Sequence, residues 1–169
     1  MLGFAAWSGT GKTTLLSKVL KILVGCGFSI GVVKHAHHSF DIEDDDRETL
    51  VWREAGVSQM VISSGSVSAL IVERDATSDL KLDELLHEFR SDSLDLVLVE
   101  GFKREAFPKI ELHRDALALS FLFPEDSNII ALATDGTPPK TELPVLDLNQ
   151  VQSMATFIID YLQIKSTCS

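Results

Sequence analysis

The chain has 169 residues, a length typical of one domain built on a single hydrophobic core. Apolar residues make up 45% of the sequence and the mean hydropathy is +0.16, which predicts a globular protein rather than a disordered one. The formal net charge of −10 argues against nucleic acid or an anionic membrane as the main partner, because both require a basic surface.

The sequence predicts a cytoplasmic protein. No apolar run could span a bilayer, and the apolar stretch before Ser8 is too short for a signal peptide. Cys26 and Cys168 follow neither metal-ligand spacing nor a disulfide-rich pattern, so we expect two reduced thiols. Without a linker or repeat, residues 1–169 are predicted to form one nucleotide-binding domain, with residues 164–169 as a frayed tail.

Residues 2–14, LGFAAWSGTGKTT, predict a strand, a glycine-rich loop and the start of a helix. The window from Ala6 to Thr13 follows the phosphate-loop pattern G-x-x-x-x-G-K-[ST], except that Ala6 replaces the first glycine. We expect this substitution to be tolerated, because the backbone still bends only mildly at the end of a strand. The alternative is a chance turn rich in glycine and threonine.

The chemistry of a triphosphate explains this pattern. Gly9 and Gly11 can adopt positive φ and aim successive backbone N–H groups at phosphate, and the following helix adds its N-terminal amides. Lys12 would reach the β and γ phosphates, and the Thr13 hydroxyl would bind Mg²⁺.

After this loop, the hydrophobic spacing predicts alternating helices and strands. We expect helices at residues 13–25, 48–55, 77–90 and 149–163, and strands at 28–34, 57–63, 67–73, 94–100, 109–113, 128–134 and 145–148. Ser64-Gly65-Ser66 is typical of a tight hairpin, which predicts that part of the sheet is antiparallel. The predicted fold class is α/β, a three-layer P-loop NTPase fold with a mostly parallel mixed sheet and helices on both faces.

Glu100 ends the apolar strand LDLVLVE, which is typical of a central parallel strand. Sites for phosphoryl transfer place an acid there, beside the phosphate loop and opposite the hydroxyl of Thr13. We therefore predict that Glu100 binds Mg²⁺, the alternative being a plain surface acid. Asp95 begins the same strand and would lie at the wrong edge of the sheet.

The loop at 35–47 carries His35, His37 and His38 at the carboxyl end of a strand, where α/β sheets bind ligands. Three interpretations stay open: recognition of phosphate or a partner ligand, binding of a transition metal, and a solvated loop. The acidic run at 43–46 is most simply solvated.

Base recognition and hydrolysis have weaker signals. Guanine presents paired N–H donors that one carboxylate can accept; the N-K-x-D motif is absent, and Asp135 after a strand is the available substitute, or else a turn-forming residue before glycine. Phe102 stands where many GTPases carry a water-orienting glutamine, and no arginine finger is assignable. We expect intrinsic turnover on the order of 10⁻³ s⁻¹ or below.

Three segments in this order, AAWSGTGKTTLL, VVKHAHH and LDLVLVEGFK, resemble the MobB family of molybdopterin-guanine dinucleotide biosynthesis adapter proteins, and the resemblance covers nearly the whole chain. It implies a homodimer that binds GTP and Mg²⁺, hydrolyses GTP weakly and partners the guanylyltransferase that joins GMP to molybdopterin. Two positions depart from related patterns: Arg47-Glu48-Thr49 replaces a Lys-Asp-Ser-like triplet, and Trp7 stands where related dimeric ATPases carry a lysine.

The predicted site combines the motif and the resemblance. Lys12 and Glu100 are the predicted catalytic residues, and Thr13 and Glu100 the predicted metal ligands. The predicted ligand-binding residues, for GTP or a bound molybdopterin, are Ser8, Gly9, Thr10, Gly11, Lys12, Thr13, Thr14, His35, His37, His38 and Asp135.

Other functions share the phosphate loop. A small-molecule kinase would need an arginine-bearing lid, and residues 114–127 offer only Arg114. A metallochaperone GTPase would use the histidines as metal ligands. A scaffold that binds nucleotide without hydrolysing it is the remaining alternative.

Overall fold

The computed structural model describes residues 1–35, 47–72, 80–89 and 93–162. It divides into two compact units, one of residues 1–35 with 82–169 and one of residues 36–81. The first unit contains the phosphate loop, and the second contains a hairpin. In the described part of the chain, no helix is both long and apolar enough to cross a membrane.

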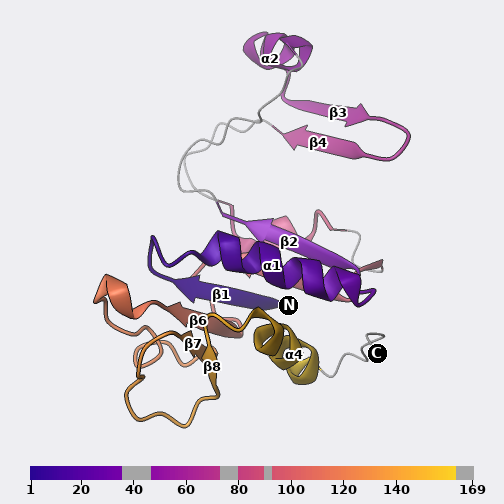
Figure 1. The fold of residues 1–169 in the computed structure, drawn as a ribbon. Helices are drawn as coiled ribbons and strands as arrows, with labels where there is room; N and C mark the ends of the chain where they lie inside the picture. The colour runs from indigo at the N-terminus through magenta and orange to yellow at the C-terminus, as the bar shows by residue number, and fades with distance from the viewer. Residues whose placement is uncertain (36–46, 73–79, 90–92, 163–169) are drawn as a thin grey trace. The chain divides into compact units, whose positions relative to one another are not determined.

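The first unit is built on a six-stranded sheet with the order β2-β5-β1-β6-β7-β8 (Figure 1). The strands are β1 (Leu2–Ala6), β2 (Ile30–Lys34), β5 (Leu96–Glu100), β6 (Lys109–His113), β7 (Ile129–Thr134) and β8 (Val145–Asp147). Every pairing in this sheet is parallel, so all six carboxyl ends lie at one edge. The strand β1 lies between β5 and β6, which places the ends of both neighbours beside the loop that follows β1.

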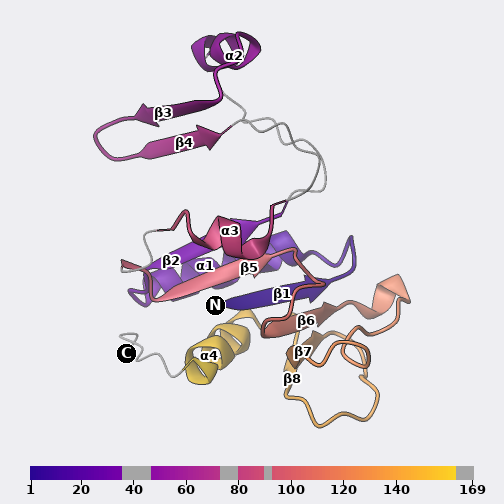
Figure 2. The same ribbon diagram turned by 180° about the vertical axis from the view of Figure 1, so that it is seen from behind.

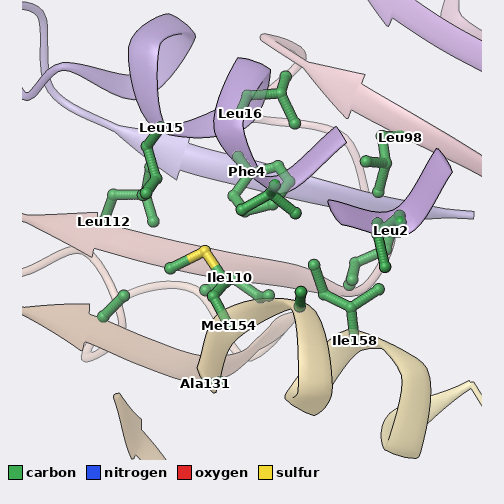
Figure 3. Close-up of a cluster of buried hydrophobic side chains, with 14 of the residues drawn as sticks. Leu2, Phe4, Leu15, Leu16, Leu98, Ile110, Leu112, Ala131, Met154 and Ile158 are labelled. Atoms are coloured by element: carbon green, nitrogen blue, oxygen red, sulfur yellow. The ribbon is translucent and has the colours of Figure 1, made fainter. Parts of the chain in front are cut away.

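Two helices cover one face of the sheet, α1 (Lys12–Gly25) and α4 (Val151–Tyr161), and they pack against each other. Alternate residues of the strands point into this layer, because successive side chains of a strand face opposite sides. Figure 3 shows the two helices closing over it. The fully or nearly fully buried members include Leu2, Phe4, Leu16, Leu98, Ile110, Leu112, Met154 and Ile158.

The opposite face is covered near β2 and β5 by α3 (Leu82–Leu86), as Figure 2 shows. Its Leu82 packs with Val33, Val99 and Phe107 in a second, smaller core. Helices on both faces confirm the predicted fold class. The helix predicted at 77–90 is too long at both ends: residues 80 and 81 are not helical, and after Leu86 the N–H groups of Glu88 and Phe89 donate to the carbonyl oxygens of Leu85 and Leu86 and form a turn.

The second unit contains α2 (Arg47–Glu54) and the antiparallel strands β3 (Gln59–Ser63) and β4 (Ser68–Val72). The helix and the hairpin agree with the sequence prediction, and Gly56, with φ of 87°, follows the end of the helix. However, the hairpin forms a separate two-stranded sheet, so the prediction of an antiparallel part in the main sheet is wrong. Hairpin formation is local and readable from the turn, whereas the sheet that a hairpin joins depends on distant residues.

Cys26 ends α1 and is buried, but it is disulfide-bonded and not the reduced thiol that the sequence predicts. The spacing of the cysteines in the sequence gives no pattern from which an oxidised Cys26 could be predicted. Cys168 lies outside the described residues.

Candidate functional site

The loop between β1 and α1 has the backbone conformation that a phosphate loop needs. Gly9 and Gly11 adopt φ of 81° and 86°, in the left-handed region that glycine tolerates best. Gly11 is the N-cap of α1, and Lys12 is its first residue, so the N-terminal amides of the helix face this loop. Ala6 is buried in the main core at the end of β1, which explains how a methyl group is accommodated there.

A cavity of about 380 Å³ lies over the loop, a volume suited to a small ligand. It brings together the predicted residues of the loop with the acid of β5. The lining residues are Trp7, Ser8, Gly9, Thr10, Gly11, Lys12, Thr13, Thr14 and Glu100.

Thr10 shapes the loop from within. It is 3% exposed, and its hydroxyl donates to the carbonyl oxygen of Trp7 at 2.6 Å. The Thr10 backbone N–H donates to the same oxygen at 3.4 Å, which closes a tight turn. Its role is therefore to hold the loop, with its side chain buried.

Glu100, at the end of β5, contacts Thr13 in the first turn of α1. The two strands β1 and β5 pair with Phe4 beside Glu100, which brings the acid to the start of the loop. Glu100 is 7% exposed, and its Oε1 accepts a hydrogen bond of 2.8 Å from the Thr13 hydroxyl. A hydroxyl and a carboxylate are hard oxygen donors of the kind that Mg²⁺ binds, so the residues fit that ion.

His35 is attached to the same acid through the backbone. Its N–H donates to the carbonyl oxygen of Glu100 at 2.9 Å, and its ring lies 4.9 Å from the ring of Phe102. Gly101 and Phe102 both adopt positive φ, 99° and 51°, so the chain turns sharply after β5. His37 and His38 lie outside the described residues.

Asp135 lies at the same sheet edge, two strands from β1. It lines a second cavity of about 370 Å³ at the carboxyl ends of β7 and β8, with Thr134, Gly136, Val145, Leu146, Asp147 and Asn149. Its Oδ2 accepts from Nη1 of Arg114 at 2.8 Å, and its Oδ1 accepts from the backbone N–H of Asp115 at 2.9 Å. It does not line the cavity over the phosphate loop.

Sequence reasoning missed two cations beside the loop. Arg114 follows β6 directly and donates from Nε to the carbonyl oxygen of Thr10 at 3.2 Å. The strand-end rule that selected Glu100 would also have selected Arg114. Lys103 places its Nζ 4.9 Å from the ring centroid of Trp7, a cation–π contact that no sequence pattern signals.

Three buried polar residues, which alternate along β6, contact the segment of chain that follows this strand. Lys109 pairs with Asp126 at 2.9 Å, and Glu111 accepts from the backbone N–H groups of Leu122 and Phe123 at 2.7 and 2.8 Å. His113 lies 3.0 Å from the carbonyl oxygen of Leu119. This segment also contacts the phosphate loop, because Trp7 donates from its indole nitrogen to Ser120 at 2.8 Å.

The charges of these anchors respond to burial and to their partners. Burial raises the pKa of Glu111 above its ordinary value, and the two backbone donors only partly oppose this. Burial also acts to raise the pKa of Asp126, but hydrogen bonds from Lys109 and Asn128 outweigh it, so that this pKa is lowered.

A parallel sheet whose central strand runs through a glycine-rich loop into a helix, with an acid on the neighbouring strand, defines a P-loop NTPase α/β fold. The family model described as molybdopterin guanine dinucleotide synthesis protein B, MobB, matches residues 1–135, and the chain belongs to this family. The resemblance that the sequence motifs indicate is therefore confirmed.

Relatives and solved structures agree with this assignment. The molybdopterin-guanine dinucleotide biosynthesis adapter protein of Escherichia coli (strain K12) is 38% identical over 167 residues, 96% of this chain and 93% of that protein. The adapter protein of Haemophilus influenzae is 36% identical over 163 residues, covering 96% and 89%.

Crystal structures support the fold. The MobB homolog from Bacillus stearothermophilus has a TM-score of 0.72 at 24% identity, covering 97% of this chain and 98% of that one. Bacillus subtilis MobB has a TM-score of 0.71 at 20% identity, with the same coverage.

Proposed function

We propose that this chain binds GTP and Mg²⁺ at the phosphate loop and acts as a cytoplasmic adapter that assists attachment of GMP to molybdopterin. Membership of the MobB family supports the pathway, since the curated relatives carry the name of molybdopterin-guanine dinucleotide biosynthesis adapters. The observation that carries the nucleotide is the convergence of Lys12, Thr13 and Glu100 on one cavity.

The proposed roles follow from the chemistry of the groups. The loop amides and the start of α1 would hold the phosphates, and Lys12 would bind the β and γ phosphates. Thr13 and Glu100 would hold Mg²⁺, which would neutralise charge on the phosphate oxygens. Their 2.8 Å contact supports this role because it brings the two oxygens close enough to bind one ion.

The nucleobase would occupy the second cavity, at the carboxyl ends of β7 and β8. Both cavities lie at the carboxyl edge of the same sheet, where α/β folds bind ligands. Besides Asp135, the second cavity carries the carboxylate of Asp147, and a carboxylate acceptor suits the N1–H and N2–H₂ donors of guanine better than the acceptor at N1 of adenine.

Hydrolysis would be slow, on the order of 10⁻³ s⁻¹ or below, because none of the described residues that line the loop cavity is a glutamine that could orient water. Phe102 follows Gly101 at the position where a glutamine would act, and its ring lies against His35. The nucleotide would therefore serve mainly to promote binding and assembly rather than to be hydrolysed. The protein partner would be the guanylyltransferase, and molybdopterin would bind near the loop that begins at His35.

The chain would act as a homodimer. Val61 and Leu70 lie opposite each other on the hairpin of β3 and β4 and are 69% and 55% exposed. A two-stranded sheet is marginally stable alone, so a second copy that covers this apolar pair would stabilise it. Leu70→Lys should shift the mass measured by light scattering from dimer to monomer, whereas an unchanged dimer would rule out this surface.

Calorimetric titration with GTP, ATP and molybdopterin, each with and without Mg²⁺, tests the proposal. We expect GTP to bind more tightly than ATP and more tightly with Mg²⁺. Lys12→Ala should lose most of this binding, whereas Lys18→Ala, an exposed lysine one to two turns further along α1, should keep it.

A complementation assay connects binding to the pathway. Lys12→Ala should fail to restore formation of molybdopterin-guanine dinucleotide in cells that lack the adapter, and Lys18→Ala should restore it. Normal cofactor synthesis with Lys12→Ala would show that nucleotide binding is not the function.

A further inference from the structure

We propose that Asp135 is a positioning residue that acts through Arg114 on the phosphate loop, rather than a carboxylate that reads the base. The inference rests on the proposed function, because it assumes that nucleotide phosphates bind at this loop. It assigns Arg114 a place in the site and gives Asp135 a different task from the one that the sequence suggests.

The guanidinium of Arg114 joins two parts of the sheet edge. Its Nε donates to the carbonyl oxygen of Thr10 in the loop, at 3.2 Å, and its Nη1 donates to Oδ2 of Asp135 after β7, at 2.8 Å. Because the guanidinium is planar and rigid, two acceptors on different sides fix its orientation. The Arg114 side chain is 37% exposed, so this order comes from its partners rather than from burial.

The third nitrogen of the group lies toward the loop. Nη2 of Arg114 is 4.0 Å from the point where a side chain at Gly11 would begin. Gly11 is the N-cap residue from which α1 starts, next to Lys12. The fixed orientation therefore holds a permanent positive charge beside the place where an anionic ligand would bind.

The carboxylate of Asp135 is already committed to protein donors. Oδ2 accepts from Arg114, and Oδ1 accepts from the backbone N–H of Asp115 at 2.9 Å. Guanine would require both oxygens at once, since it presents N1–H and N2–H₂ side by side. Reading the base would thus compete with both bonds and release Arg114.

The segment that begins at Arg114 packs closely against both the phosphate loop and the turn after β7. Gly136 packs so closely on Asp115 that an added Cβ would lie 2.8 Å from the Asp115 side chain. On the other side, a Cβ at Gly9 would lie 3.9 Å from Leu117. The segment from Arg114 to Leu117 therefore contacts both the phosphate loop and the turn that carries Asp135.

The test is calorimetric titration of GTP, ATP and XTP into the full chain. Xanthine carries an oxygen where guanine carries its N2 amino group, so an asparagine that faced the base would favour XTP. The variants are Arg114→Ala, Arg114→Lys, Asp135→Asn and the double variant of Arg114→Ala with Asp135→Asn. Arg104→Ala, an exposed arginine in the loop after β5, is the matched control.

We expect Arg114→Ala and Asp135→Asn each to weaken GTP and ATP about tenfold, with no gain of XTP binding. The double variant should be no weaker than the weaker single variant, because the two residues act as one unit. Arg114→Lys should not restore affinity, since an ammonium group cannot reach both acceptors with the same geometry. Arg104→Ala should bind like the unaltered chain.

Two outcomes would overturn the inference alone. A switch of Asp135→Asn from GTP to XTP would show that Asp135 reads the base, and unaltered affinity of Arg114→Ala would show that the pair does nothing for the loop. Full rescue by Arg114→Lys would reduce the role to bare charge and also overturn it. If the unaltered chain bound no nucleotide, or Lys12→Ala bound it equally well, the proposed function itself would fail, and the inference with it.

Discussion

The hydroxyl of Thr13 donates to Oε1 of Glu100 at 2.8 Å, although 87 positions of the sequence separate the two residues. The contact exists because β5 pairs in parallel with β1, so the end of one strand lies beside the loop that follows the other. A divalent ion could be bound by both residues without loss of this hydrogen bond, since the hydroxyl donates through its proton and binds the ion through a lone pair.

Glu100→Gln should remove most of the Mg²⁺ dependence of GTP binding. The amide keeps a hydrogen-bonding oxygen for Thr13 but loses the negative charge that a divalent ion requires. Titration calorimetry with and without Mg²⁺ measures the factor by which the ion raises the affinity for GTP. This factor should be large for the unaltered chain and at least about tenfold smaller for the variant.

Glu105→Gln is the matched control for this prediction, since Glu105 is an exposed acid five residues further on. It should keep the full effect of Mg²⁺. An undiminished effect in Glu100→Gln would mean that the ion, if bound, is held by other groups.

Gly101→Ala should destabilise the protein and weaken Mg²⁺-dependent binding together. Gly101 has φ of 99°, and an added Cβ would lie 2.7 Å from Cβ of His35. Strain of about 1–3 kcal/mol is expected at such a position, and relieving it would move the turn that carries Glu100. Urea unfolding followed by circular dichroism measures the loss of stability, and calorimetry measures the loss of binding.

Gly65→Ala provides the comparison, because nothing lies within 4 Å of a Cβ at Gly65 and its φ is not in the left-handed region. That variant should unfold at about the same urea concentration as the unaltered chain, or slightly higher. Equal stability of Gly101→Ala would show that the turn after β5 adapts without cost.

The phosphate loop and Glu100 could be predicted from the sequence because each depends on a local pattern. The loop before Lys12 follows a motif with a strand and a helix on either side, and Glu100 was selected by the rule that parallel strands end at one edge. Arg114 obeys the same rule, but in the sequence it stands out only as a single arginine, too few for the lid of a kinase. Its partners, Thr10 and Asp135, come from two other strand ends, and only the strand order brings the three together.

The burial of the polar residues in β6 could not be predicted from the sequence for a related reason. Lys109, Glu111 and His113 alternate along the strand, and all three are buried. Each finds a partner in the chain that follows, such as Asp126 for Lys109. Burial of a charged strand face depends on a covering segment with matching donors and acceptors, and no periodicity in β6 itself reveals that segment.

Glu111 should make stability depend on pH. Burial raises its pKa above 4.5, so between 4.5 and the folded-state pKa the folded chain binds more protons than the unfolded chain. The contribution of Glu111 to the free energy of unfolding must therefore decrease as pH rises through this window and level off above it. Asp126, whose pKa is lowered, acts in the opposite sense and only in more acid solution.

Urea unfolding from about pH 5 to about pH 8 for the unaltered chain and for Glu111→Gln isolates this effect. The free energy of the unaltered chain minus that of Glu111→Gln should fall as pH rises. A difference that stays constant or grows with pH would contradict a raised pKa.

Trp7 should report nucleotide binding by its fluorescence. The chain has only two tryptophans, Trp7 and Trp52, and Trp7 lines the cavity over the phosphate loop while Trp52 belongs to the other compact unit. The Trp7 ring carries Lys103 above it, and its indole N–H bonds to Ser120. Phosphates that bind in this cavity would attract Lys103 and alter the surroundings of the ring.

Titration of Trp52→Phe with GTP should therefore change the emission, whereas Trp7→Phe should show no change at equal occupancy measured by calorimetry. A signal that followed Trp52 would place the ligand outside the loop cavity or couple it to the second unit.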